Sequence, residues 1–199
     1  MRRRASSRIN PHRFIMTAIA FSFVEQAAIG AGLGVAEFLF CTTCQKTCML
    51  AGIQFEEIMD SDDVHPSERL DKMFSEMTII YPICEELVFR GLLQPFLTKC
   101  LLYSWPQLET PSLFGISQAS LISSTAIGTI FGMMHYMNYQ KGGEIIVGIG
   151  SVSGSFFGIT RARFGLTTSI SAHMIHNYLM GWLDKHYPAF LDSSVREAP

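Results

Sequence analysis

Apolar residues along the chain gather into five long segments, each close to the roughly 20 residues that a membrane-spanning helix needs. The first segment is long and contains Glu25 and Glu37, so we expect it to be tilted or partly interfacial, and the fourth is short. Because backbone polar groups must be satisfied internally in lipid, the pattern predicts an all-α, multi-pass bundle of about five membrane helices with polar residues facing inward. The segments are 14–41, 76–103, 113–138, 144–160 and 166–183.

The segment between the first two apolar runs differs in kind. Residues 42–72 are rich in Asp and Glu, which predicts an acidic surface loop, with a short helix around 67–75. The predicted organisation has four parts. They are a basic N-terminal segment (1–13), a first membrane helix with the acidic loop (14–75), a membrane core that carries the candidate chemistry (76–184) and a C-terminal tail (185–199).

Glycines recur four residues apart in several of the apolar segments. Small residues at this spacing let helices approach closely in lipid. We therefore assign these glycines to the scaffold and give them no chemical role. They are Gly30 and Gly34, Gly128 and Gly132, and Gly150, Gly154 and Gly158.

Composition strengthens the membrane interpretation. The chain is 48% hydrophobic and 16% charged, whereas soluble domains carry about 25% charged residues. A net charge of −2 argues against a nucleic-acid partner. The arginine-rich start is compatible with a signal peptide, an organelle transit peptide or a positive-inside anchor. The apolar run that follows is too long for a signal peptide and lacks a clear cleavage site, which favours an uncleaved membrane helix.

The cysteines are candidates for metal binding or redox chemistry. Cys41, Cys44 and Cys48 form the cluster CTTCQKTC. A CxxC pair can bind zinc or carry out redox chemistry, but zinc normally needs four ligands and the sequence has no second pair. We interpret the three as free thiols at a helix end, and Cys84 and Cys100 as small apolar residues within helices.

Two adjacent glutamates and an arginine interrupt the second apolar segment, in EELVFRG at 85–91. Glu86 and Arg90 are four residues apart, so they share a helix face and can pair. Glu85 points about 100° away from Glu86. One carboxylate can therefore pair with arginine while the other stays available as a general base. A purely structural ion-pair network is the alternative.

Polar groups also occur in the third and fifth apolar segments, in FGMMH and HMIHN. Phe131 and His135 share one helix face, and a histidine there can equally be a satisfied core or interfacial residue. His173 and Asn177 share another face, part of which His176 can reach. Such a pair can hold helices together or can donate to a developing negative charge, as in an oxyanion hole.

Together these groups supply a glutamate, two histidines and an asparagine from three helices. They provide a water-activating base and an oxyanion stabiliser, which predicts a hydrolase without a serine or cysteine nucleophile. One rival is a catalytically silent scaffold or immunity protein that binds another membrane protein. Another is a transporter or proton relay, which predicts polar residues along the whole path across the bilayer. Three complete, compact motifs favour the enzyme.

The same residues carry a family resemblance. EELVFRG resembles an EExxxR motif, FGMMH an FxxxH motif and HMIHN an HxxxN motif, in that order and each within an apolar helix. Over about 76–184 the chain resembles the CPBP family of intramembrane proteases, which includes the type II CAAX prenyl endopeptidases and the bacterial Abi-type proteins. It offers fewer helices than relatives in that family often have.

The resemblance implies an intramembrane endopeptidase and a role for each motif residue. Glu85 and His135 would activate a water for attack on a peptide carbonyl. His173 and Asn177 would stabilise the oxyanion.

The remaining implications concern supporting groups, cofactors and partners. Glu86 and Arg90 would support the site. The resemblance favours a metal-free glutamate mechanism with no cofactor; a glutamate and two histidines can also bind zinc, but the HExxH signature of zinc proteases is missing. The implied partners are a membrane-associated peptide or protein substrate and the lipid bilayer.

Overall fold

The computed structural model describes residues 22–57, 76–112 and 114–187, and most of them are helical, as the all-α prediction requires. The basic segment 1–13, the short helix predicted at 67–75 and residues 188–199 of the tail lie outside the described residues. The α-helices are α1 (Phe23–Leu50), α3 (Tyr81–Glu86), α4 (Gln94–Ser104), α5 (Gln118–His135), α6 (Gly143–Phe164) and α7 (Leu166–His186). The π-helical segments are η2 (Glu76–Ile80) and η3 (Leu87–Leu93), and the 3-10 turns are η4 (Pro106–Glu109) and η5 (Tyr136–Asn138). Two short antiparallel strands, β1 (Glu56–Glu57) and β2 (Tyr139–Lys141), pair with each other.

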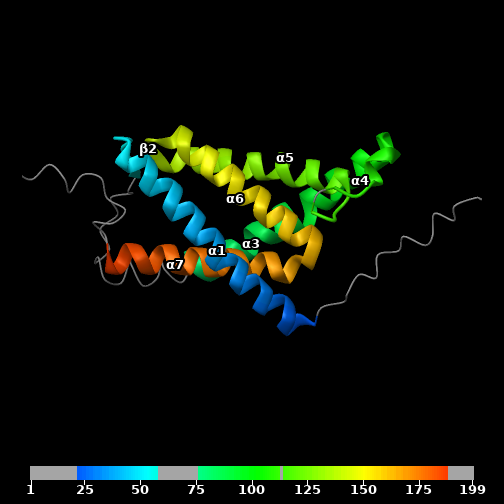
Figure 1. The fold of residues 1–199 in the computed structure, drawn as a ribbon, viewed down its shortest axis with the longest axis horizontal. Helices are drawn as coiled ribbons and strands as arrows, with labels where there is room; N and C mark the ends of the chain where they lie inside the picture. The colour runs from blue at the N-terminus through cyan, green and yellow to red at the C-terminus, as the bar shows by residue number, and fades with distance from the viewer. Residues whose placement is uncertain (1–21, 58–75, 113, 188–199) are drawn as a thin grey trace, which may run out of the picture.

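Two helix pairs form the body of the molecule (Figure 1). α5 runs alongside α6, and α1 packs on α7. The continuous helical stretch 76–104 links the two pairs, because its α3 contacts α7 and its α4 contacts α5. The three helical stretches that carry the sequence motifs are therefore neighbours in space.

The first helix is longer at its C-terminal end than the sequence pattern predicted. We expected it to end at 41 and the loop to begin at 42, but α1 continues to Leu50. Threonine hydroxyls explain the extension, because they donate to carbonyls of the preceding turn: Thr43 to Leu39 at 2.6 Å and Thr47 to Thr43 at 2.7 Å. These polar side chains are satisfied within the helix and do not end it. The CTTCQKTC cluster is thus helical, and the prediction of a loop at 42–50 was wrong.

The third predicted helix starts later than expected and ends earlier. We expected 113–138, but α5 begins at Gln118, because the hydroxyl of Ser117 caps it by accepting a bond from the N–H of Ser120 at 3.1 Å. Just before the cap, Gly115 has a φ of +67°, a left-handed conformation that cannot continue an α-helix. Gly165, with a φ of +106°, likewise separates α6 from α7.

Prolines shape the segment that carries the two glutamates. Pro82 and Pro95 each follow a π-helical segment, η2 and η3 respectively. A proline has no N–H to donate to the carbonyl four residues earlier. In a π-helix each N–H donates instead to the carbonyl five residues earlier, as the N–H of Gln94 does to the carbonyl of Phe89, so each donor is paired one residue further back than in an α-helix. π-helical turns are rare in proteins, and those that occur are often at functional sites. In this chain η3 contains Arg90.

The glycine repeats lie where helices meet, as predicted. A Cβ on Gly34 would collide with the backbone of Ala172 on α7, and a Cβ on Gly154 would lie 2.8 Å from Cα of Gly128 on α5. By contrast, a Cβ on Gly32 or Gly148 would meet nothing within 4 Å. The glycines at helix contacts therefore set the separation of α1 from α7 and of α5 from α6.

Gly154→Ala is expected to destabilise the protein by roughly 1–3 kcal/mol, because an added methyl in a tight contact forces the helices apart. Gly148→Ala on the same helix is the matched control and should leave stability unchanged or slightly higher. The measurement is thermal or denaturant unfolding in detergent. Equal stability of the two variants would contradict the close packing of α5 on α6.

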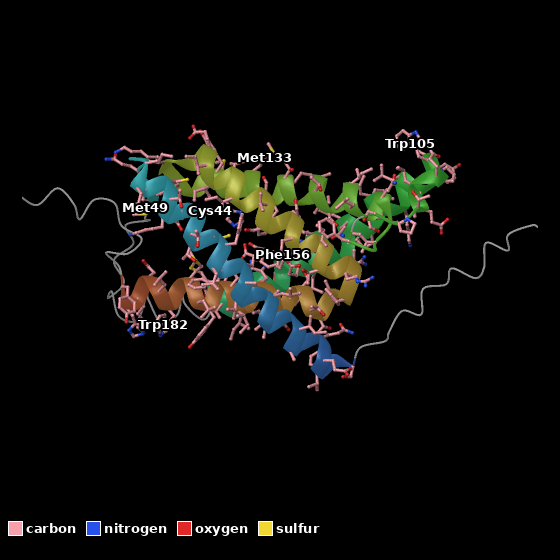
Figure 2. All side chains as sticks on the ribbon, viewed as in Figure 1. Cys44, Met49, Trp105, Met133, Phe156 and Trp182 are labelled. Atoms are coloured by element: carbon pink, nitrogen blue, oxygen red, sulfur yellow. The ribbon has the colours of Figure 1, made fainter. Side chains whose placement is uncertain are left out.

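The distribution of side chains is that of a protein embedded in lipid. Large apolar residues such as Leu92, Phe96 and Met133 are exposed, whereas Glu86, Arg90 and other polar residues are buried. Figure 2 shows Met133 at the outer edge of α5. Among the described residues, α1 and α6 are long and apolar enough to cross a membrane on their own. Polar residues inside and apolar residues outside is the arrangement expected of helices in a bilayer.

Candidate active site

A buried ion pair lies at the centre of the site. Glu86, the last residue of α3, and Arg90 in η3 have no exposed surface, and Arg90 Nη1 lies 3.0 Å from Glu86 Oε1. The pairing predicted from their four-residue spacing is therefore confirmed. Burial of both charges makes the pair intolerant of losing either partner, because the remaining charge would be stranded away from water.

Arg90 is enclosed by aromatic rings. Its guanidinium carbon lies 4.6 Å from the ring centre of Phe131 and 5.7 Å from that of Phe157. Its Nη2 also donates to the carbonyl of Gly154 at 2.8 Å. A cation over aromatic faces is attracted by their negative quadrupole. Arg90 therefore ties the stretch 76–104 to α5 and α6.

Glu86 also accepts from two side chains of α7. Ser169 donates its hydroxyl to Oε2 of Glu86, and Nδ1 of His173 lies 3.1 Å from Oε1. The Ser169 hydroxyl is also within 3.0 Å of the Phe157 carbonyl. Because a carboxylate only accepts, the contact assigns a proton to Nδ1 of His173. Glu86 thus holds the imidazole in one orientation.

His173 faces both glutamates. Its other ring nitrogen, Nε2, lies 3.6 Å from Oε2 of Glu85, whose side chain is 33% exposed, against 4% for His173. The imidazole stacks on Phe157 at 4.7 Å between ring centres and meets Phe131 edge-on at 5.7 Å. The two adjacent glutamates therefore differ in environment: Glu86 is fully buried, whereas Glu85 is partly exposed and lies beside Nε2 of His173.

His135 also packs against Phe131. Its ring centre is 4.6 Å from that of Phe131, and its Nδ1 is 2.8 Å from the Phe131 carbonyl. A carbonyl can only accept, so Nδ1 carries a proton and Nε2 of the neutral ring is an acceptor. The Phe131 ring therefore contacts both His135 and His173.

Asn177 lies one turn beyond His173 on α7. Its Nδ2 donates to the backbone carbonyl of Met77 in η2 at 2.9 Å. A carboxamide nitrogen has two N–H groups, so this bond fixes the side chain and leaves a second donor. The predicted residues Glu85, Glu86, Arg90 and His173 are therefore linked by direct contacts. His135 contacts Phe131, which also contacts His173. Asn177 is bonded to η2, the segment that precedes Glu85.

Several polar partners of the site were not predicted. Ser169 precedes His173 by four residues, and Gln94 follows Arg90 by four, so both spacings were readable in the sequence. Gln94 is fully buried and donates from Nε2 to Ser124 Oγ at 2.9 Å and to the Gly158 carbonyl at 3.0 Å. These bonds continue the polar face of Glu86 and Arg90 along the helix.

A second polar cluster was also missed. We expected His176 to share part of the His173 face, but its Nδ1 lies against the carboxylate of Glu37 on α1. Glu37 is 3% exposed and also accepts from Cys41 and Ser153. A single glutamate in an apolar helix gives no indication of which helix it faces, so the sequence pattern suggested only a tilted or interfacial helix.

Comparison with known proteins identifies one family. The family model described as type II CAAX prenyl endopeptidase Rce1-like matches residues 73–179, more than half of the chain. The matched range contains Glu85, His135, His173 and Asn177 and excludes α1. No curated protein and no solved structure matches the chain.

Proposed function

Because the chain belongs to the Rce1-like family of type II CAAX prenyl endopeptidases, and is therefore related to CAAX-type intramembrane proteases, we propose that it hydrolyses a peptide bond with a water activated by Glu85 and His135. The observation that carries the proposal is the position of Glu85, which lies 3.6 Å from Nε2 of His173 while Glu86 holds the opposite nitrogen at 3.1 Å. This arrangement leaves one glutamate for chemistry and uses the other to orient a histidine.

Glu85 and His135 together act as the general base in the proposal. The Glu85 side chain is 33% exposed. His135 donates its Nδ1 proton to the Phe131 carbonyl and so presents Nε2 as an acceptor. A water between such groups can lose a proton as its oxygen attacks the carbonyl carbon of the substrate. The proton then passes to the nitrogen of the leaving peptide when the C–N bond breaks.

The oxyanion is the second requirement of peptide hydrolysis. In the proposal it is stabilised by the second N–H of Asn177 and by the Nε2–H of His173 in its doubly protonated form, in which Nδ1 donates to Glu86 at the same time. Both donors are held by bonds that do not involve the substrate, His173 by Glu86 and Asn177 by the Met77 carbonyl. Donors fixed in advance stabilise developing charge without reorganisation during the reaction.

The proposed mechanism uses no metal ion and no other cofactor. The proposed partners are a membrane-associated peptide or protein substrate and the bilayer itself, in which the helical stretches of the described residues form a multi-pass bundle. Exposed apolar residues such as Phe96 and Met133 on the outer surface support contact with lipid.

The proposal is tested by a cleavage assay on the purified full chain in lipid nanodiscs. Two peptides are compared that end in a cysteine, two aliphatic residues and a variable residue, one farnesylated on the cysteine and one not, with products identified by mass spectrometry. We expect release of the last three residues from the farnesylated peptide. Binding of that peptide without cleavage by the folded protein would favour a silent scaffold and contradict the proposal.

Asn177→Ala is expected to lower the cleavage rate by roughly 10²–10³-fold, the usual effect of removing one oxyanion donor. The loss should appear in kcat, because the interaction forms in the transition state. Steady-state kinetics on the cleaved peptide are the measurement, and the melting temperature serves as the control for folding. A loss below about tenfold would reassign Asn177 to packing of α7 on η2.

A further inference from the structure

A buried cluster of ligand-type side chains lies where α1, α6 and α7 meet. Glu37 and Cys41 share one face of α1, Ser153 comes from α6 and His176 from α7. Glu37, Cys41 and Ser153 are all less than one-tenth exposed, and the His176 side chain is 15% exposed. The proposed mechanism uses none of these residues.

The two oxygens of the Glu37 carboxylate have different environments. Oε1 accepts from the Cys41 thiol at 2.8 Å and from the Ser153 hydroxyl, and these two donors are 3.0 Å apart. Oε2 faces Nδ1 of His176. Among the described residues, neither Oε2 nor Nδ1 has a hydrogen-bond partner of good geometry, although both are buried. A nearly fully buried carboxylate therefore points one oxygen at the His176 ring and the other at Cys41 and Ser153.

A cation stabilises a carboxylate at this depth. α1 is one of the helices long and apolar enough to cross a membrane, and ionised groups inside a bilayer are costly unless paired. Among the described residues, the cation-forming group in contact with Glu37 is His176. An imidazolium would supply one positive charge through a single contact, whereas a metal ion would use the Cys41 sulfur as a ligand as well.

The donor set matches the preferences of zinc. Thiolate, imidazole and carboxylate are the three ligand types of protein zinc sites. The ligand atoms of Glu37, Cys41 and His176 all lie within 4.8 Å of one another. Bond lengths of 2.0–2.3 Å place the ligands of one tetrahedral zinc ion roughly 3.5 Å apart. The cluster is of that size, and zinc binding would open its closest contacts, such as the 2.8 Å between Cys41 Sγ and Glu37 Oε1.

We propose that Glu37, Cys41 and His176 bind one zinc ion, which ties α1 to the rest of the bundle. Binding releases the thiol proton of Cys41, because zinc takes the thiolate. The Ser153 hydroxyl, which touches both Glu37 and Cys41, is placed to orient them or to complete the coordination with a water. Three protein ligands from two helices make the ion a cross-link between α1 and α7.

The zinc site is separate from the proposed active site. The two histidines contact Phe157 differently: the ring stacks on His173 at 4.7 Å and lies edge-on to His176 at 6.4 Å, and His176 pairs with Glu37 whereas His173 pairs with Glu86. Moreover, Glu37 and Cys41 belong to α1, which lies outside the segment matched by the family model. The ion therefore has a structural role, and no step of hydrolysis passes through it.

The test measures metal binding by the full chain, purified in detergent with an affinity tag that contains no histidine. Zinc content is determined by mass spectrometry, and cobalt is added to the metal-free protein to record the charge-transfer absorption of a cobalt–thiolate bond. We expect one zinc per chain and a thiolate band in the wild type. Cys41→Ser should abolish the band, and His176→Gln should weaken zinc binding by more than about 100-fold, since even loss of an outer partner of a zinc ligand costs 10–100-fold.

Matched variants separate this site from the other thiols and from the active site. Cys44→Ser changes a neighbouring thiol on α1, labelled in Figure 2, and should keep the zinc and the cobalt band. Glu85→Gln should also keep the zinc, so failure of the catalytic proposal and failure of the zinc proposal are distinguishable.

Measurements on the wild type keep the proposal testable if a ligand variant does not fold. Added zinc should raise the melting temperature of the metal-free wild type, because a ligand that binds only the folded state stabilises it. The proposal is overturned if the folded wild type binds no zinc, if cobalt gives no thiolate band, or if Cys41→Ser and His176→Gln retain wild-type affinity.

Discussion

Glu85→Gln is expected to lower the rate of peptide cleavage by roughly 10²–10⁴-fold, the range that one general base contributes. Glutamine keeps the size of the side chain and its place beside Nε2 of His173, but it cannot take a proton from water. The measurement is the initial rate of product formation from the farnesylated peptide in nanodiscs, with His135→Ala expected to show a comparable loss.

The control for this prediction is Glu109→Gln. Glu109 is an exposed glutamate of η4, far along the chain from the motifs, and its replacement should leave the rate unchanged. Unchanged melting temperature in Glu85→Gln would show that the loss is chemical. Full activity of Glu85→Gln or of His135→Ala would contradict the proposed water activation.

Glu86→Gln should destabilise the protein by about 3–5 kcal/mol, the usual cost of breaking a buried ion pair by removing one partner. The neutral amide leaves the Arg90 charge without its counter-ion among three aromatic rings. It also replaces the acceptor of Ser169 and His173. Denaturant unfolding in detergent measures the effect.

The two adjacent glutamates are therefore expected to give opposite results. Glu85→Gln should be stable and inactive, whereas Glu86→Gln should be unstable whether or not some activity survives. The comparison is matched, since both variants make the same chemical change at neighbouring positions. Equal stability of the two would show that the Glu86–Arg90 pair is not the centre of the fold.

Local spacing predicted the parts of the site that lie on single helices. Glu86 and Arg90, Phe131 and His135, and His173 and Asn177 are each four residues apart, and helix geometry alone puts each pair on one face. The same rule would have added Ser169 and Gln94 to the site, because each is four residues from a predicted member. The five helical stretches of the described residues were predictable, because apolar runs of about 20 residues are typical of membrane-spanning helices.

Contacts between helices could not be predicted from spacing. Nothing in the sequence says that His173 rather than His176 faces Glu86, and the structure divides the two histidines between Glu86 and Glu37. Spacing likewise does not say that the Phe131 ring lies against both His135 and His173, as it does in the structure.

The end of α1 shows a further limit of prediction from polarity. Thr43 and Thr47 look like loop residues by polarity, but their hydroxyls bond within the helix. A polar side chain that satisfies itself on the preceding turn has no need of water, so polarity does not mark the helix end. The buried Glu37 and Cys41 were overlooked for a related reason, because their partners come from α6 and α7.

The most direct test of the central claim is an experimental structure of the chain bound to a peptide whose scissile amide is replaced by a phosphinate. This group is a tetrahedral anion that resembles the intermediate of water attack. One phosphinate oxygen should lie within hydrogen-bonding distance of His173 Nε2 and Asn177 Nδ2, with the other facing Glu85 and His135. A phosphinate bound elsewhere, or bound with Glu85 and His173 turned away from it, would contradict the proposed mechanism.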